Sequence, residues 1–315
     1  MQEVFGAILE SGWTPLLIER THPFLVRASN PDGARLDLRV YIWNCTPGGA
    51  NRSPDEFRIQ FTSTVPVVDP HATTLLLGWH DENATFIAWD ISKHDGQASN
   101  SPSAQVKEGT IAGANDNAFA TQRKDNEVVI AFRPAFFMDY ARARSSLHAT
   151  GAAEADTALL NHLPALTDAE IDGVGNAERR RVIRMIATRF RARDFRDRVL
   201  SAYGHSCAFC RVQLSLLDAA HILPVAAPGS TDEIVNGVAL CKIHHFAYDA
   251  KLVSFSVNYE IQVSAARLAE LAGRHGGLRA FRTALGTTLS LPARVADHPR
   301  PSYIRASRRI RGWRD

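Results

Sequence analysis

Four potential metal ligands stand in two closely spaced pairs in the C-terminal half of this chain. Cys207 and Cys210 are separated by two residues, and so are Cys241 and His244. Two short turns that each supply two ligands at this spacing close a tetrahedral shell around Zn(II). The alternative, thiols and histidines gathered by chance, leaves the repeated spacing unexplained. The sequence therefore predicts a structural zinc site, and the remaining cysteine, Cys45, lies outside it.

A second set of polar residues lies inside this zinc frame. His221 stands in an apolar, strand-like stretch, and Asn236 precedes a second apolar run. The segment after the second ligand pair reads as a short helix, on which His245 and Asp249 are four residues apart and share one face. A strand, a loop, a second strand and a helix would bring these four residues together. A structural zinc site alone does not require them.

This pattern resembles the HNH (ββα-metal) endonuclease family. The resemblance covers roughly residues 190–260 and depends on three stretches in the expected order. These stretches are Ala220-His221-Ile222 with Pro224, the pair Asn236-Gly237, and Cys241-x-x-His244-His245. The resemblance implies a metal-dependent endonuclease that hydrolyses phosphodiester bonds of DNA.

The chemistry of phosphodiester hydrolysis assigns roles to these residues. His221, whose imidazole has an ordinary pKa of about 6.5, is the candidate general base. His245 and Asp249 would hold a catalytic divalent cation, Mg(II) or Mn(II), with Ni(II) as an alternative. The resemblance implies that Asn236 braces the loop and orients His221. Two metals with different tasks are therefore expected.

One position departs from the HNH pattern. Many members carry a further metal ligand directly before the catalytic histidine, where this chain has Ala220. Asp218 lies two residues earlier and, because strand side chains alternate, shares the side of Ala220. Asp218 could replace the missing ligand, or it could orient the zinc knuckle or a neighbouring arginine.

Positive charge is concentrated in the half of the chain that carries the motif. The whole chain has a net charge of +3, divided into −4 for residues 1–150 and +7 for residues 151–315. Arginine suits bidentate contact with phosphate. The alternative is a solvated helix face paired with Asp194 and Asp197. As a group beside the nuclease motif, the candidates for binding double-stranded DNA are Arg189, Arg191, Arg193 and Arg196.

The predicted fold class is α+β in two domains. A β-rich recognition or sensor domain is expected at 1–150, a linker or connecting helix at 151–175, and a mostly helical HNH domain with a basic tail at 176–315, its core at 200–256. Strands are expected at 34–43, 56–61, 74–79, 85–90 and 127–132. Helices are expected near the N-terminus and at 167–173, 176–190, 194–203, 264–273 and 277–284, before an extended end. The stretch 92–117 reads as a loop too polar to form core.

The N-terminal domain offers aromatic and polar side chains that could form a pocket for a base. They are Trp43, Trp79, Phe86, Trp89, Arg58, Gln60, Lys93, His94 and the loop 99–103. The alternative is that these tryptophans are core residues of strands. Trp79 and Phe86 flank a turn and predict a hairpin.

Composition excludes several other classes of protein. No apolar run approaches the roughly 18 residues of a membrane span, and the N-terminus lacks a basic leader. Few cysteines, three of them assigned to metal, predict no disulfide framework and a cytoplasmic protein. A single HNH site cuts one strand at a time, so a homodimer is expected for double-strand breaks.

Three functions fit the sequence. The first is a restriction or defence endonuclease whose N-terminal domain selects a target, modified or plain. The second is a defence effector whose N-terminal domain binds a small ligand or a protein. The third is a non-catalytic zinc-containing DNA-binding protein.

Overall fold

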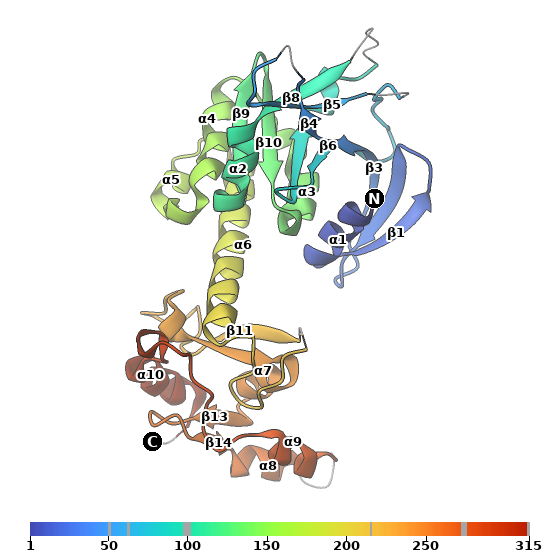
Figure 1. Ribbon diagram of the computed structural model, residues 1–315. Coiled ribbons are helices and arrows are strands. Elements are labelled where there is room, and N and C mark those ends of the chain that lie inside the picture. The colour runs from blue at the N-terminus through green and yellow to red at the C-terminus, as the bar shows by residue number, and fades with distance from the viewer. Residues whose placement is uncertain (50–51, 62–63, 97–101, 215, 272–275, 314–315) are drawn as a thin grey trace. The chain divides into compact units, whose positions relative to one another are not determined.

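The computed structural model describes residues 1–49, 52–61, 64–96, 102–214, 216–271 and 276–313 (Figure 1). The chain divides into two compact units, Met1–Phe190 and Arg191–Asp315. Within the described residues, no helix is both long enough and apolar enough to cross a membrane.

A seven-stranded sheet forms the centre of the first unit. Its order is β1-β2-β3-β6-β7-β10-β9, and all neighbours are antiparallel except the parallel pair β3 and β6. The strands are β1 (Thr14–Glu19), β2 (Phe24–Ser29), β3 (Arg35–Asn44), β6 (Thr73–His80), β7 (Thr85–Trp89), β9 (Phe119–Lys124) and β10 (Glu127–Phe132). A second sheet contains β4 (Thr46–Pro47), β5 (Glu56–Gln60) and β8 (Ser103–Lys107).

Both faces of the central sheet are buried, and strand alternation assigns its residues to two cores. In β10, Val128, Ile130 and Phe132 contribute to one core, whereas Val129 and Ala131 contribute to the other. The first core also receives α1, α3 and the early part of α6, and α2 covers the other face against β9 and β10 (Figure 1). The helices of this unit are α1 (Gln2–Glu10), α2 (Glu108–Asn117), α3 (Phe137–Leu147), α4 (Ala152–Ala158), α5 (Asp168–Asp172) and the beginning of α6 (Ala177–Ala202), with 3-10 turns η1 (Ile91–Lys93), η2 (Pro134–Phe136) and η3 (Leu159–Ala165).

The second unit has a two-stranded hairpin and a helix at its centre. Hairpin strand β11 (Leu217–His221) pairs antiparallel with β12 (Gly237–Cys241), and α7 (Lys242–Asp249) follows directly. Phe195 and Val199 of α6 pack in the same core. The other elements are η4 (Ile234–Asn236), β13 (Val253–Phe255), β14 (Ile261–Val263), α8 (Ala265–Leu271), α9 (Leu278–Ala284), η5 (Val295–Asp297) and α10 (Pro301–Arg311).

Gly237 is required where α6 packs on this hairpin. A Cβ atom at Gly237 would lie 2.3 Å from Val199 Cγ2 and 3.1 Å from Phe195 Cζ. The first distance is far inside van der Waals contact, so the absence of a side chain allows the helix to approach the strand. The Asn236-Gly237 pair therefore serves the packing of the second unit.

The predicted α+β class is confirmed, with a β-rich first part and a largely helical second part that contains the ββα core. The hairpin is confirmed too, since Trp79 of β6 is paired with Phe86 of β7. The expected strands correspond to β3, β5, β6, β7 and β10. The sequence did not indicate β1, β2 and β9.

Three other expectations differ from the structure. The stretch 92–117 contains β8 and α2, and its Val106 and Ile111 are buried, so the prediction of a loop too polar for core was wrong. The chain end predicted as extended contains α10, whose Tyr303 and Ile304 are buried. The two helices expected at 176–190 and 194–203 are one helix, α6. The last two residues of the helix expected at 264–273 lie outside the described residues.

The boundary between the two compact units lies later in the chain than the linker that the sequence predicted. The sequence predicted a linker at 151–175, whereas the two compact units meet after Phe190. The reason is that Leu160, Leu163 and Ile171 are buried in the core of the first unit. This segment packs as part of the first unit.

Candidate active site and zinc site

The four predicted zinc ligands converge in the second unit. The ligand atoms of Cys207, Cys210, Cys241 and His244 all lie within 4.8 Å of one another. Nδ1 of His244 is 3.6 Å from Sγ of Cys207 and 3.3 Å from Sγ of Cys241. Three sulfurs and one imidazole nitrogen at these separations fit a tetrahedral Zn(II) shell. Within the part of the chain that the structure describes, this is the one cluster of three or more such residues close enough to share an ion.

The electrostatics of the cluster favour a metal. Burial raises the pKa of the Cys207 thiol, but hydrogen bonds with His244 and with backbone groups outweigh burial and lower it to about 6. Burial raises the pKa of Cys210 to about 12, and it also raises that of Cys241. Neighbouring thiolates repel one another, so a cation is needed to hold all three in the charged form.

Asn236 braces the loop that connects the two hairpin strands. Its side chain is fully buried, and its Oδ1 accepts a hydrogen bond from the backbone N–H of Leu223 at 2.8 Å. Its Nδ2 donates to the carbonyl of Thr231 at 2.8 Å and contacts Ser230 Oγ at 3.2 Å. One amide therefore ties the beginning of the loop to its end. These contacts hold the loop; the part of the implied role by which Asn236 orients His221 stays a prediction.

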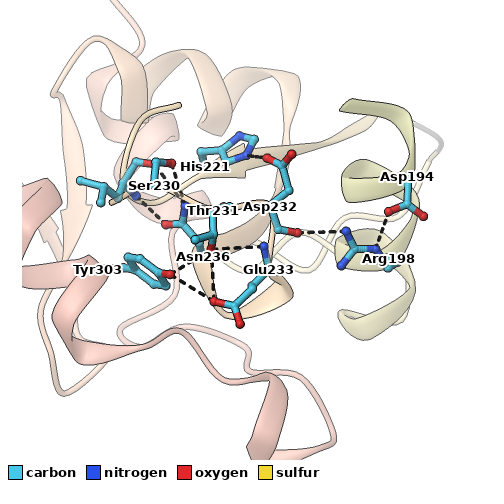
Figure 2. Close-up of polar contacts among 10 residues, drawn as sticks. Asp194, Arg198, His221, Ser230, Thr231, Asp232, Glu233, Asn236 and Tyr303 are labelled. Carbon is cyan, nitrogen blue, oxygen red and sulfur yellow. Dashed lines mark hydrogen bonds and ion pairs between the residues drawn. The ribbon is translucent and has the colours of Figure 1, made fainter. Parts of the chain in front are cut away.

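The ring of His221 is held at the end of β11 by two neighbours. Its Nε2 lies 2.9 Å from Oδ1 of Asp232, a residue of the connecting loop (Figure 2). The face of the ring stacks on Phe195 of α6, with centroids 3.8 Å apart and planes 16° apart. The His221 side chain retains 18% exposure, so these two contacts do not close it off from solvent.

His245 turns away from the zinc cluster, although it is adjacent to His244. Its Nε2 lies 3.4 Å from a carboxylate oxygen of Asp249, one helical turn on, and its Nδ1 lies 3.7 Å from Asp218. The two carboxylates therefore face opposite edges of one imidazole. A cation bound to Nε2 of His245 would lie next to Asp249, and a cation bound to Nδ1 would lie next to Asp218. In this arrangement one cation cannot contact both carboxylates and the imidazole.

Both carboxylates beside His245 also contact cations of the protein. Asp218 lies 2.7 Å from Lys242 Nζ and 3.4 Å from Arg196 Nε, and Asp249 lies 3.3 Å from Arg311. Burial raises the pKa of Asp218, but the hydrogen bond and charge of Lys242 outweigh it, so the pKa is lowered. Asp218 is thus held ionised between α6 and α7, beside the nitrogen of His245 that faces away from Asp249.

The four candidate DNA-binding arginines have different surroundings. Arg189 belongs to the first unit, where it lies 2.8 Å from Asp139, a residue 1% exposed, and donates to the carbonyl of Ser11. These contacts favour a structural role, because they offset the charge of a buried carboxylate. Arg196 also donates to the carbonyl of Leu217. Arg193 lies 4.0 Å from Asp197 of α6, and its side chain is partly buried.

The aromatic residues proposed as a base pocket divide into two groups. Phe86 and Trp89 are fully buried in the cores, as the alternative interpretation held, and Trp79 packs against Phe86 with the two rings tilted by 57°. Trp43 is partly buried and packs against His22 and Phe61. A cavity of about 280 Å³ does lie beside Lys93, His94, Ser103, Ala104, Gln105 and the turn Lys124, Asp125, Asn126 and Glu127. Residues 99–101 of the predicted loop lie outside the described residues.

The sequence did not single out Asp232. Asp232 lies in a turn-rich stretch of the sequence, and nothing in its spacing from His221 marks it as a partner. The strand register could have given a clue, because His221 is paired with Gly237 and so stands at the mouth of the loop that carries Asp232. The contact itself depends on the three-dimensional course of this loop.

Comparisons with known proteins identify two segments. Residues 207–256 match the family model described as HNH endonuclease, and residues 36–141 match the one described as Methylase-associated X1. No curated protein matches the chain. Among solved structures, the chain is similar to a "Modification dependent TagI restriction endonuclease", with 11% identity, a TM-score of 0.31, and coverage of 86% of this chain and 80% of that one. This similarity is too low to carry a functional argument.

The match at 207–256 agrees with the pattern of cysteines, histidines and asparagine seen in the sequence and with their convergence in the structure. The chain carries an HNH endonuclease domain and is a nuclease, a phosphodiester hydrolase.

Proposed function

We propose that this nuclease cuts double-stranded DNA with the help of a divalent cation, and that its N-terminal unit selects the target, with modified DNA as the preferred class. The observation that carries the proposal is the placement of His221, at the end of β11 in a matching HNH domain, with its ring held by Asp232 and Phe195. A general base must be held in a fixed orientation toward the water that it deprotonates, and these two contacts fix the orientation of the His221 ring. The restriction or defence role is proposed on the same basis.

In the proposed reaction, His221 takes a proton from the attacking water, and Asn236 keeps the loop around His221 in place. His245 and Asp249 would hold the cation, since an imidazole and a carboxylate form a donor set that Mg(II), Mn(II) and Ni(II) accept. When bound, such a cation offsets negative charge on the phosphate and the leaving oxygen. Asp218 remains the alternative carboxylate, on the other edge of the His245 ring.

The roles of the adjacent histidines can be separated by substitution. In His245→Ala we expect a folded protein with its zinc, but cleavage at least about 100-fold slower with Mg(II), Mn(II) or Ni(II), because a ligand of the catalytic cation is lost. Zinc content and plasmid nicking are the measurements. The matched variant His244→Ala should lose zinc. Loss of zinc from His245→Ala instead would mean that the two roles are exchanged.

Two arginines of α6 in the second unit, the exposed Arg191 and the partly buried Arg193, give the proposal an electrostatic test. Replacing Arg191 and Arg193 by Gln should weaken DNA binding equally for all sequences and reduce the slope of log K against log salt by about 1 to 2, since each phosphate contact contributes about 0.9. Binding is measured without a catalytic cation. Arg279→Gln with Arg282→Gln removes two exposed arginines of α9 as a control. Equal slopes for both double variants would place Arg191 and Arg193 on a structural face.

The N-terminal unit is proposed as the selector because it contains the segment that matches a methylase-associated family. The proposal is supported by the cavity of about 280 Å³ beside His94 and Glu127, which is lined by several hydrogen-bonding side chains. The second candidate, a sensor of a small ligand, would use the same cavity.

The test of the function uses the full chain. Supercoiled plasmid, plain or cytosine-methylated, is incubated with Mg(II), Mn(II) or Ni(II), and we expect nicked or linear product with preference for the methylated form. Affinity for methylated, hydroxymethylated and plain duplexes is measured on a cleavage-deficient His221 variant. Equal cleavage and affinity for all forms would reject selection by modification. No cleavage of any DNA with any of these metals would contradict the proposed substrate.

A further inference from the structure

His221 is fixed by contacts on both an edge and a face of its ring. Asp232 contacts Nε2 at 2.9 Å, and Phe195 covers one face at 3.8 Å. A carboxylate accepts hydrogen bonds and donates none, so the proton in this contact belongs to Nε2 of His221. The neutral ring then carries its lone pair on Nδ1. The contact with Asp232 therefore determines that Nδ1, and not Nε2, is the nitrogen that can accept a proton.

The loop that carries Asp232 is itself tied down from two sides close to this residue. Arg198 of α6 donates to the backbone carbonyl of Asp232 at 3.0 Å, and Asp194 holds Arg198 at 2.7 Å (Figure 2). Asn236 donates to the carbonyl of Thr231, the preceding residue. The backbone on both sides of the Asp232 side chain is thus positioned by side chains of other elements.

A third contact comes from the C-terminal helix. Tyr303 of α10 places its hydroxyl 2.9 Å from Thr231 Oγ1 and donates to Glu233 at 3.2 Å, so it contacts both neighbours of Asp232 (Figure 2). Arg300 lies 3.3 Å from the same Glu233. Contacts from α6, η4 and α10 therefore converge on one short turn.

We propose that Asp232 is a positioning residue for His221, which rests on the proposed role of His221 as the base. Its carboxylate holds the proton on Nε2, orients the ring and leaves Nδ1 to accept a proton from water. As that proton transfers to Nδ1, the water oxygen forms a bond to phosphorus and the bond from phosphorus to the leaving oxygen breaks. The leaving oxygen takes a proton from solvent, and the imidazolium, paired with Asp232, later returns its proton to solvent.

A merely structural ion pair would behave differently from a positioning residue. The Asp232 side chain is 42% exposed, so its replacement leaves no buried charge behind and the unit should stay folded. If the pair were merely structural, its loss would leave the turnover rate unchanged, and if the contact did not form in solution, its loss would leave the protonated nitrogen of His221 unchanged. A positioning residue must change both.

The kinetic test compares Asp232→Asn with wild type and with Glu260→Gln, which removes an exposed carboxylate of the same unit. In Asp232→Asn, whose amide can donate to Nε2 and favour the other tautomer, kcat should fall by about 10- to 100-fold with KM for DNA unchanged. Asp232→Glu, which keeps an acceptor, should recover much of kcat. An unchanged kcat in Asp232→Asn, or a loss confined to KM, would overturn the proposal.

A spectroscopic test requires no cleavage and so separates this proposal from the proposed function. In protein with ¹⁵N-labelled histidine, the ring signals of His221, assigned by their absence in a His221 variant, should show the proton on Nε2. Asp232→Asn should shift the population toward Nδ1–H, and Glu260→Gln should not. The same tautomer in wild type and Asp232→Asn would overturn the positioning role even if the enzyme cuts DNA. A wild type that cuts no DNA but shows the expected tautomer change would reject the function and retain the Asp232–His221 coupling.

Discussion

Cys207→Ser is expected to unfold the second unit and to release its zinc. Zinc binding to small structural sites contributes on the order of 10 kcal/mol, which is comparable to the whole stability of a typical domain. Cys207 is fully buried among the core residues Phe209 and Val253, so the ligand site and the hydrophobic core are one structure. Serine lacks the thiolate and cannot restore the shell. Metal analysis should find less than stoichiometric zinc, and limited proteolysis should degrade the chain after about Phe190.

The control for this prediction is Cys45→Ser in the first unit. Cys45 is also buried, so serine there should cost about 1 to 3 kcal/mol of stability for an imperfectly paired hydroxyl. Zinc content should nevertheless stay at wild-type level, because Cys45 lies outside the cluster. A Cys207→Ser protein that keeps stoichiometric zinc and resists protease as wild type does would remove Cys207 from the ligand set.

The sequence predicted the elements whose signal is local. Ligand spacing located the cluster of Cys207, Cys210, Cys241 and His244, and apolar runs located the hairpin strands around His221 and Asn236. β1 was missed because it shows no clean alternation. Its Leu16 and Ile18 are 58% and 45% exposed, as suits a strand at the edge of a sheet.

The polar stretch 92–117 was misjudged for a related reason. Its composition is that of a loop, but a few apolar residues are enough to anchor α2 on the central sheet, and Ile111 and Ala114 are those residues. A helix needs one narrow apolar face to pack on a sheet, and its average hydrophobicity can be low. Composition over the whole stretch concealed this face.

The sequence named residues for the candidate site, but it did not indicate the contacts that support them. The pattern named His221, Asn236, His245 and Asp249, and the structure places Asn236 at the loop contacts and His245 beside Asp249. It could not name Asp232, because the contact with His221 depends on how α6 and α10 hold the loop. Likewise, the sequence grouped Arg189 with its neighbours, whereas tertiary contact with Asp139 sets it apart.

His221→Asn is expected to lower cleavage by about 10² to 10⁴-fold, the usual contribution of a positioned general base. Asparagine is polar and can still contact Asp232, so the loop should keep its place, but its amide cannot accept a proton at neutral pH. DNA affinity without catalytic cation, zinc content and thermal stability should match those of wild type. The loss should therefore appear in the single-turnover rate.

The matched control is His205→Asn in the same unit. His205 is exposed and has a positive φ of 50°, a conformation that asparagine tolerates, so the exchange should change neither fold nor rate. The comparison separates the effect of losing the His221 imidazole from the effect of replacing any histidine of this unit by asparagine. If His221→Asn and His205→Asn both cut DNA at the wild-type rate, His221 is not the base, and the carboxylates beside His245 become the groups to examine. If His221→Asn alone is slow but has also lost zinc, the loss arises from folding rather than from chemistry.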